Sequence, residues 1–233
     1  MSRRWIPILL VLLLIGASAY LLVRDDGDPS AARNLAETQR TFDTDDWMER
    51  ACALPEKQLV RIWRGHHDAH SEDVTIVPLP PNYSGGFGTT SHSGPWEYLQ
   101  NVPLVLYGPD HITTAGPLDT FATLADVYPT VGALTGVELP ARDGRVLSEA
   151  IVRGADPPSL VVTVVWDGVG RNVLEHWDGR WPNLERLERQ GASFVRATVG
   201  SSPSITPATH ATLGTGSFPA DHSVTAIEYR GEG

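Results

Sequence analysis

The stretch Leu160-Val-Val-Thr-Val-Val-Trp-Asp167 decides the expected fold. Its first seven residues carry no charge and no alternation of polar and apolar side chains, which is typical of a β-strand covered on both faces. Such strands belong to parallel sheets flanked by helices. Ligands of these sheets bind beyond the carboxyl ends of the strands, where Asp167 and Gly168 stand. Asp167 is therefore a candidate metal ligand, although an Asp in this place can also cap a helix.

The sequence on either side of this stretch predicts alternating strands and helices. Further strands are predicted at residues 74–77, 102–107 and 193–199, and helices at 47–54, 122–134, 183–190 and 206–216. This order predicts an α/β domain with a mainly parallel sheet and flanking helices.

Composition excludes several classes of protein. The 233 residues hold 18 Lys plus Arg against 28 Asp plus Glu, a net charge of −10, so no nucleic-acid binding surface is expected. The 41% content of hydrophobic residues argues against a wholly disordered chain. The single cysteine, Cys52, allows neither an internal disulfide nor a cysteine-based zinc cluster. A metal ion would have to be held by histidines and carboxylates.

The N-terminal residues predict a membrane segment. Ile6–Val23 is an almost continuous apolar run of 18 residues, long enough at ~1.5 Å per residue to cross a bilayer core. Two arginines precede it and three aspartates follow closely, which places the rest of the chain outside the cytoplasm. A signal peptide cleaved after Ala19, which would yield a secreted protein, is the alternative, but the apolar run continues past that point. The predicted organisation is an anchor or signal at 1–24, a polar tether with a short helix at 25–70, and an α/β domain at 71–233.

A second chemically informative segment spans Gly200–Gly216. Thr206 fits the N-cap of a helix and Pro207 fits its first position. The N-terminus of a helix attracts phosphate, so a phosphate brought to this hydroxyl would be favoured. Thr206 as an ordinary helix cap is the competing interpretation.

Three motifs join these segments. They are Val164-Val-Trp-Asp-Gly168, Trp181-Pro-Asn-Leu followed by Gly191, and Thr206-Pro-Ala-Thr-His210 with the turn Pro219-Ala-Asp-His222. Together they resemble the alkaline phosphatase superfamily, and especially its nucleotide pyrophosphatase/phosphodiesterase branch. The resemblance implies that Asp167 is a zinc ligand, and that Thr206 is the nucleophile and a further, weaker metal ligand. His210 is interpreted as a helix-packing residue and His222 as a turn residue.

Residues 91–140 resemble the C-terminal portion of the same family, through Ser91-His92-Ser-Gly-Pro-Trp and Val102-Pro-Leu-Val-Leu-Tyr-Gly108. The resemblance implies that His92 is a metal ligand, whereas Asp126 is interpreted as a structural residue at a helix start. We expect His92, Asp167 and Thr206 to lie close together.

Two departures from the family pattern affect this interpretation. The C-terminal portion precedes the N-terminal one, as in a circular permutation. The middle portion, which carries an Asp-x-x-x-His pair and an Asp-His pair, is absent, so we expect the chain to be a truncated piece of a longer protein. The histidine-rich stretch His66–His70 can bind a metal adventitiously or form a solvated loop, and the loop is preferred.

The resemblance implies a metal-dependent hydrolase of small phosphate mono- or diesters with a phospho-threonine intermediate on Thr206. Two Zn²⁺ ions per complete site are expected, and the 233 residues alone are expected to hydrolyse little. The alternative is a non-catalytic, membrane-tethered binding or interaction domain with a degenerate site. A sulfatase is excluded because Thr206 cannot be oxidised to an aldehyde, and a Ser/His/Asp hydrolase is disfavoured because the chain has no Gly-x-Ser-x-Gly motif.

Overall fold

The computed structural model describes residues 47–82 and 91–228 of the chain, which divides into two compact units, Met1–Leu54 and Pro55–Gly233. In the first unit the described residues form helix α3 (Trp47–Cys52), which confirms the short helix predicted at 47–54. The membrane segment predicted at 1–24 lies outside the described residues. Within the described ranges, no helix is long and apolar enough to span a membrane.

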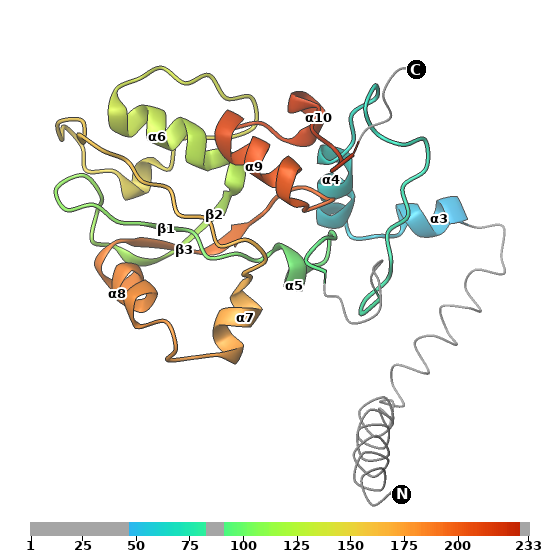
Figure 1. The fold of residues 1–233 in the computed structure, drawn as a ribbon, viewed down its shortest axis with the longest axis horizontal. Coiled ribbons are helices and arrows are strands. Elements are labelled where there is room, and N and C mark those ends of the chain that lie inside the picture. The colour runs from blue at the N-terminus through green and yellow to red at the C-terminus, as the bar shows by residue number, and fades with distance from the viewer. Residues whose placement is uncertain (1–46, 83–90, 229–233) are drawn as a thin grey trace, which may run out of the picture. The chain divides into compact units, whose positions relative to one another are not determined.

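A small mixed sheet lies at the centre of the second unit (Figure 1). Its strands are β1 (Val105–Leu106), β2 (Gly116–Thr123) and β3 (Ala192–Thr198), in the order β1-β3-β2. β3 runs parallel to β2 and antiparallel to β1. The α/β class and the strand predicted at 193–199 are therefore confirmed, and the strand predicted at 102–107 forms only at Val105–Leu106. The sheet is small and mixed, with the longer of its two pairings parallel.

Helices cover both sides of this sheet. They are α4 (Glu56–Arg64), α5 (Glu97–Gln100), α6 (Val127–Thr135), α7 (Arg171–His176), α8 (Pro182–Gln190), α9 (Thr206–Thr215) and α10 (Pro219–His222), with 3-10 turns η1 (Leu124–Asp126) and η2 (Ser148–Ala150). α8 packs against all three strands, and α6 lies beside α9 on the opposite side (Figure 1). α6 and α9 end at Gly136 and Gly216, whose φ angles of 70° and 67° suit glycine.

The hydrophobic core forms between the parallel strands β2 and β3 and the segments that contribute Ile112, Leu147 and Ala150. Its buried members are Ile112, Ala122, Leu147, Ala150, Ala192, Phe194 and Ala197. Small side chains dominate this set, so β2 and β3 can pack closely against the neighbouring segments. This core fixes the end of β3, from which the chain continues into α9.

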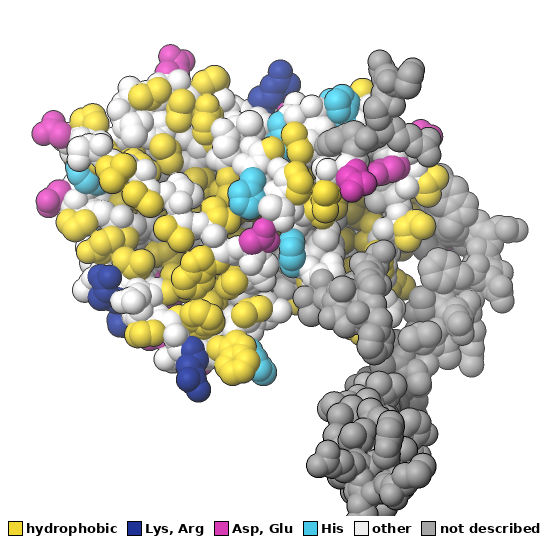
Figure 2. All heavy atoms as spheres, in the orientation of Figure 1, with side chains coloured by type: hydrophobic (Ala, Val, Ile, Leu, Met, Phe, Trp, Pro, Cys, Tyr) yellow, Lys and Arg dark blue, Asp and Glu magenta, His cyan; other side chains and the backbone are white. Residues whose placement is uncertain are grey.

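The stretch 160–166 is not the buried strand that its sequence predicts. It runs extended without pairing to any described strand, and Leu160, Val162 and Val164 are 75%, 70% and 74% exposed. β-Branched residues favour an extended backbone, but a strand also needs a neighbouring edge to pair its N–H and C=O groups. The strand predicted at 74–77 is wrong for the same reason, since Ile76 is 85% exposed. Figure 2 shows hydrophobic side chains spread over the visible face.

The helix predicted at 122–134 begins later than expected. β2 continues to Thr123, and α6 starts only at Val127 after the turn η1. Asp126 causes this change of direction, because its Oδ2 accepts the Thr123 N–H at 2.7 Å and its Oδ1 accepts the Arg145 N–H at 2.8 Å. Asp126 is thus a structural residue, as predicted.

Candidate functional site

Thr206 lies at the first turn of α9, directly after the loop that leaves β3. Ile205, not Thr206, occupies the N-cap, so the predicted cap position is wrong by one residue. The Thr206 side chain has a different partner, because its hydroxyl donates to Asp167 Oδ2 at 2.8 Å. A hydroxyl that leaves its own helix to bind a carboxylate 39 positions away in sequence is not acting as a cap.

Asp167 joins the other two predicted site residues. One carboxylate oxygen accepts the Thr206 hydroxyl, and the other lies 3.5 Å from His92 Nε2. Gly168 follows with a φ of 73°, and a Cβ built on it would lie 3.6 Å from His92 Cδ2. His92, Asp167 and Thr206 therefore meet in one place, as the sequence predicts. His92 and Asp167 are about half exposed, with side-chain exposures of 47% and 49%, so the site is open to solvent.

The ring of His92 is oriented by Ser204. His92 Nδ1 lies 3.1 Å from the Ser204 carbonyl oxygen, which can only accept, so Nδ1 carries a proton. In the neutral ring the lone pair then sits on Nε2, which faces the Asp167 carboxylate. Two acceptors 3.5 Å apart repel each other unless a proton or a metal cation lies between them.

Both the hydroxyl and the carbonyl of Ser204 take part in the contacts that hold His92. It is 3% exposed, its hydroxyl donates to the His92 carbonyl at 2.9 Å, and the same oxygen accepts the Gly94 N–H at 3.3 Å. Neither partner is an imidazole nitrogen, so Ser204 has no base positioned to activate it. The sequence did not predict that Ser204 positions His92, because residues 112 positions apart form no local sequence pattern.

The donor chemistry of this site suits zinc. Imidazole nitrogen and carboxylate oxygen are common zinc donors, and two donors on one tetrahedral zinc at ~2.1 Å stand ~3.4 Å apart. The observed separation of 3.5 Å between His92 Nε2 and Asp167 Oδ1 agrees with that spacing. The Nδ1–H bond to a carbonyl is also the arrangement that orients zinc-binding histidines.

The number of donors is small, however. Residues 47–82 and 91–228 contain no group of three or more His, Cys, Asp or Glu side chains that could hold a metal ion. A catalytic zinc has three protein ligands as a rule, so His92 and Asp167 need the Thr206 hydroxyl or further ligands to complete the site.

The two histidines that follow Thr206 make contacts away from Asp167. His210 is exposed, and its Nδ1 lies 2.9 Å from the Thr206 carbonyl one turn earlier in the same helix, so its contact is local and the helix-packing interpretation stays a prediction. His222 ends α10, where its Nδ1 accepts the Val224 N–H and its Nε2 lies 3.1 Å from Thr212 Oγ1. Burial lowers the pKa of His222.

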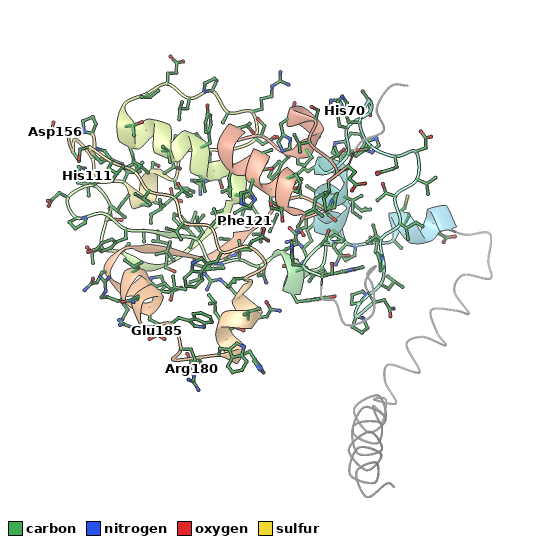
Figure 3. The ribbon with its side chains drawn as sticks, viewed as in Figure 1. His70, His111, Phe121, Asp156, Arg180 and Glu185 are labelled. Atoms are coloured by element: carbon green, nitrogen blue, oxygen red, sulfur yellow. The ribbon has the colours of Figure 1, made fainter. Side chains whose placement is uncertain are left out.

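The histidine-rich stretch lies elsewhere in the second unit. His66 Nε2 is 3.5 Å from Asp68 Oδ1, and the rings of His67 and His70 meet edge to face. Figure 3 shows His70 on the side of α4 and α10, far from His111 at the opposite end. None of these contacts connects the stretch with Asp167.

One comparison with known proteins finds a match to the segment that contains Asp167 and Thr206. Residues 161–232 match the family model of type I phosphodiesterase / nucleotide pyrophosphatase, whose members are phosphoester hydrolases. No curated protein and no solved structure matches the chain. The match includes the Asp-Gly and Thr206–His210 motifs, whereas His92 lies outside it. Over residues 161–232, the chain thus resembles the nucleotide pyrophosphatase/phosphodiesterase branch of the alkaline phosphatase superfamily, as its motifs indicate.

Proposed function

We propose that His92, Asp167 and Thr206 form part of the active site of a metal-dependent phosphoester hydrolase. The observation that carries this proposal is the 2.8 Å hydrogen bond from the Thr206 hydroxyl to Asp167, whose second oxygen faces His92. The three residues come from separate parts of the chain, and their side chains present a nucleophile beside two metal donors. The family match over residues 161–232 supports phosphoester chemistry.

Each residue has a distinct task in this reaction. Asp167 orients the Thr206 hydroxyl, and the N-terminal end of α9 attracts the negative phosphate group. His92 and Asp167 would hold a zinc ion, which when bound would supply Lewis acidity that favours ionisation of the threonine hydroxyl. Thr206 Oγ1 forms a bond to phosphorus while the ester P–O bond breaks, and the proton lost by the threonine hydroxyl ends on the leaving alcohol. Water then attacks phosphorus, the bond between Thr206 Oγ1 and phosphorus breaks, one proton of the water returns to Thr206, and hydrogen phosphate is released.

The substrate class follows from the openness of the site. No described residue encloses the Thr206 hydroxyl and Asp167, so small phosphate mono- and diesters have access to them. Pro207 has no N–H, so the backbone there contributes one donor fewer to the phosphate oxygens.

Zinc binding and phosphorylation of Thr206 test the proposal together. We expect excess zinc to raise the thermal unfolding midpoint of the full chain, since a ligand that binds only the folded state stabilises it. Asp167→Asn and His92→Gln should abolish this shift, and His176→Gln, at an exposed histidine outside the site, should keep it. After incubation with p-nitrophenyl phosphate and zinc and quenching in acid, peptide mass analysis should find phosphate on Thr206.

The non-catalytic binding domain is the rival, and the small number of described metal donors favours it. A zinc shift that survives both ligand substitutions, or a chain that takes up neither zinc nor phosphate, would support that rival and overturn the proposal.

A further inference from the structure

The two loops that build the site come from distant parts of the chain. His92 lies in the loop before α5, and Thr206 follows the loop of residues 199–205 after β3. The side chain of Gln100, the last residue of α5, lies between these two loops and is completely buried. A buried amide must satisfy its polar groups internally, so its partners show what it holds together.

The Gln100 amide bonds to both loops. Nε2 donates to the Gly94 carbonyl at 2.7 Å and to the Ser201 carbonyl at 2.9 Å, and Oε1 accepts the Gly200 N–H at 3.0 Å. Both N–H donors of the amide and one lone pair of its oxygen are thus used. The partners also fix the orientation of the amide, because carbonyl oxygens only accept and a backbone N–H only donates.

The backbone around Gln100 reinforces this position. Its carbonyl accepts the Val199 N–H at 2.9 Å, and Asn101 forms an isolated bridge with Thr198 at the end of β3. Gln100 is therefore anchored where β3 passes into the loop that leads to Thr206. Gly94, which it holds on the other side, donates to Ser204 Oγ, the group that also binds the His92 carbonyl.

We propose that Gln100 is a positioning residue of the site, which sets the separation between the His92 loop and the Thr206 loop. By holding Gly94, Gly200 and Ser201, it keeps the Ser204 carbonyl against His92 Nδ1 and so keeps the Nε2 lone pair towards Asp167. Its significance for catalysis rests on the proposed function, but its effect on His92 does not.

Gln100→Met tests this role, because methionine fills a similar volume but offers no comparable hydrogen bonds. Thr130→Val is the matched control, since it removes a buried hydroxyl with two hydrogen bonds, to the Asp126 carbonyl and from the Leu147 N–H, away from the site. Both variants should lower the denaturant midpoint. In long-range ¹H–¹⁵N spectra of the metal-free protein above the titration range of histidine, only Gln100→Met should shift His92 from the Nδ1–H tautomer towards the mixture of a free histidine.

Zinc affinity provides the second measurement. Gln100→Met should raise the zinc dissociation constant ~10–100-fold, the usual effect of losing a group that orients a metal ligand. Thr130→Val should change it by about twofold or less, because distant sites behave independently. If Gln100→Met does not fold, Gln100→Asn replaces it, since an amide one methylene shorter cannot reach both loops.

The outcomes separate the two proposals. An unchanged His92 tautomer in a folded Gln100 variant, or equal effects of the Gln100 and Thr130 variants on zinc affinity, would overturn the positioning role. A tautomer change confined to the Gln100 variants supports that role even when the wild type binds no zinc, and in that case only the proposed function fails.

Discussion

At the scale of single residues, the Thr206 hydroxyl and the Asp167 carboxylate have separable roles. In the proposed reaction the hydroxyl would be the reacting group, whereas the carboxylate, which accepts its hydrogen bond, would be the stronger metal donor. The two residues therefore respond differently to substitution.

Thr206→Val replaces the hydroxyl by a methyl group of similar size. We expect this variant to form no phospho-enzyme and to lose at least ~10³-fold in any phosphoester hydrolysis, since removing a nucleophile has effects of that order or larger. Thr206→Ser should still be phosphorylated. Both variants should keep a zinc-dependent thermal shift, because His92 and Asp167 remain. Phosphate found on another residue of the Thr206→Val variant would show that the nucleophile is misassigned.

His222 makes stability depend on pH. Burial lowers its pKa in the folded state, although backbone hydrogen bonds and the charges of Asp143 and Asp221 oppose this. The unfolded chain, with a histidine pKa of ~6.5, then takes up the proton first as pH falls. The contribution of His222 to the free energy of unfolding is therefore fully present above pH ~6.5. It is lost as the pH falls through the lowered pKa. Urea unfolding between pH 7.5 and 5 should show a smaller loss in His222→Gln than in the wild type or in the control His176→Gln.

The three site residues could be predicted only because motifs, not spacing, identified them. Asp167 and Thr206 belong to recognisable motifs, and His92 belongs to a third. The contacts of Ser204 with His92, and of Gln100 with Gly200 and Ser201, span 100 positions or more and have no such motif. These contacts depend on how the loops fold together, which no local pattern specifies.

At the scale of helices and strands, α4 supports the loop that leads to Thr206. Gly65, the residue after its last turn, lies so close to the Ser202 backbone that a Cβ there would overlap the Ser202 carbonyl oxygen. The Ser202 N–H in turn donates to the Arg61 carbonyl at 2.8 Å. α4 was not predicted as a separate helix, since the sequence assigned residues 25–70 to a tether with one short helix.

Gly65→Ala should therefore force α4 and this loop apart. We expect a loss of ~1–3 kcal/mol in the free energy of unfolding, the usual cost of overpacking. Gly214→Ala is the matched control, because no atom lies within 4 Å of the added methyl and α9 should gain ~0.5–1 kcal/mol. Urea denaturation of both variants measures the difference, and equal stabilities would show that α4 does not press on the loop.

Elements with a clear local signal were predicted well, and those that need a neighbour were not. α8 and α9 have helical spacing and glycines beyond their ends, so their bounds match within one residue. The stretch 160–166 has the strongest strand composition in the chain, yet it forms no strand. The composition of a segment indicates that it favours a strand when other strands and helices pack against it. Whether they do so depends on the tertiary structure, which the local sequence does not specify.

At the scale of the whole molecule, the predicted membrane segment would determine on which side of the membrane the site lies. Residues 1–24 lie outside the described residues, so the anchor and its orientation remain a proposal. The charges that flank the apolar run favour the N-terminus in the cytoplasm.

This orientation predicts that a protease added to intact cells removes everything after about residue 30. A tag placed before Arg3 should stay protected, whereas a tag at the C-terminus should be lost. Detection in the medium of a chain that begins near residue 20 would instead support cleavage near Ala19. Full protection of the C-terminal tag would contradict both interpretations.

The exposed side chains of Leu160, Val162 and Val164 have a practical consequence for anyone who produces this protein. An unpaired, uncharged stretch of β-branched residues is a template for irregular association between copies, at a rate that grows with concentration. Crowded expression should therefore yield inclusion bodies, and dilute refolding should yield more usable material. A lysine at position 162 or 164 should improve solubility without touching the contacts of Asp167.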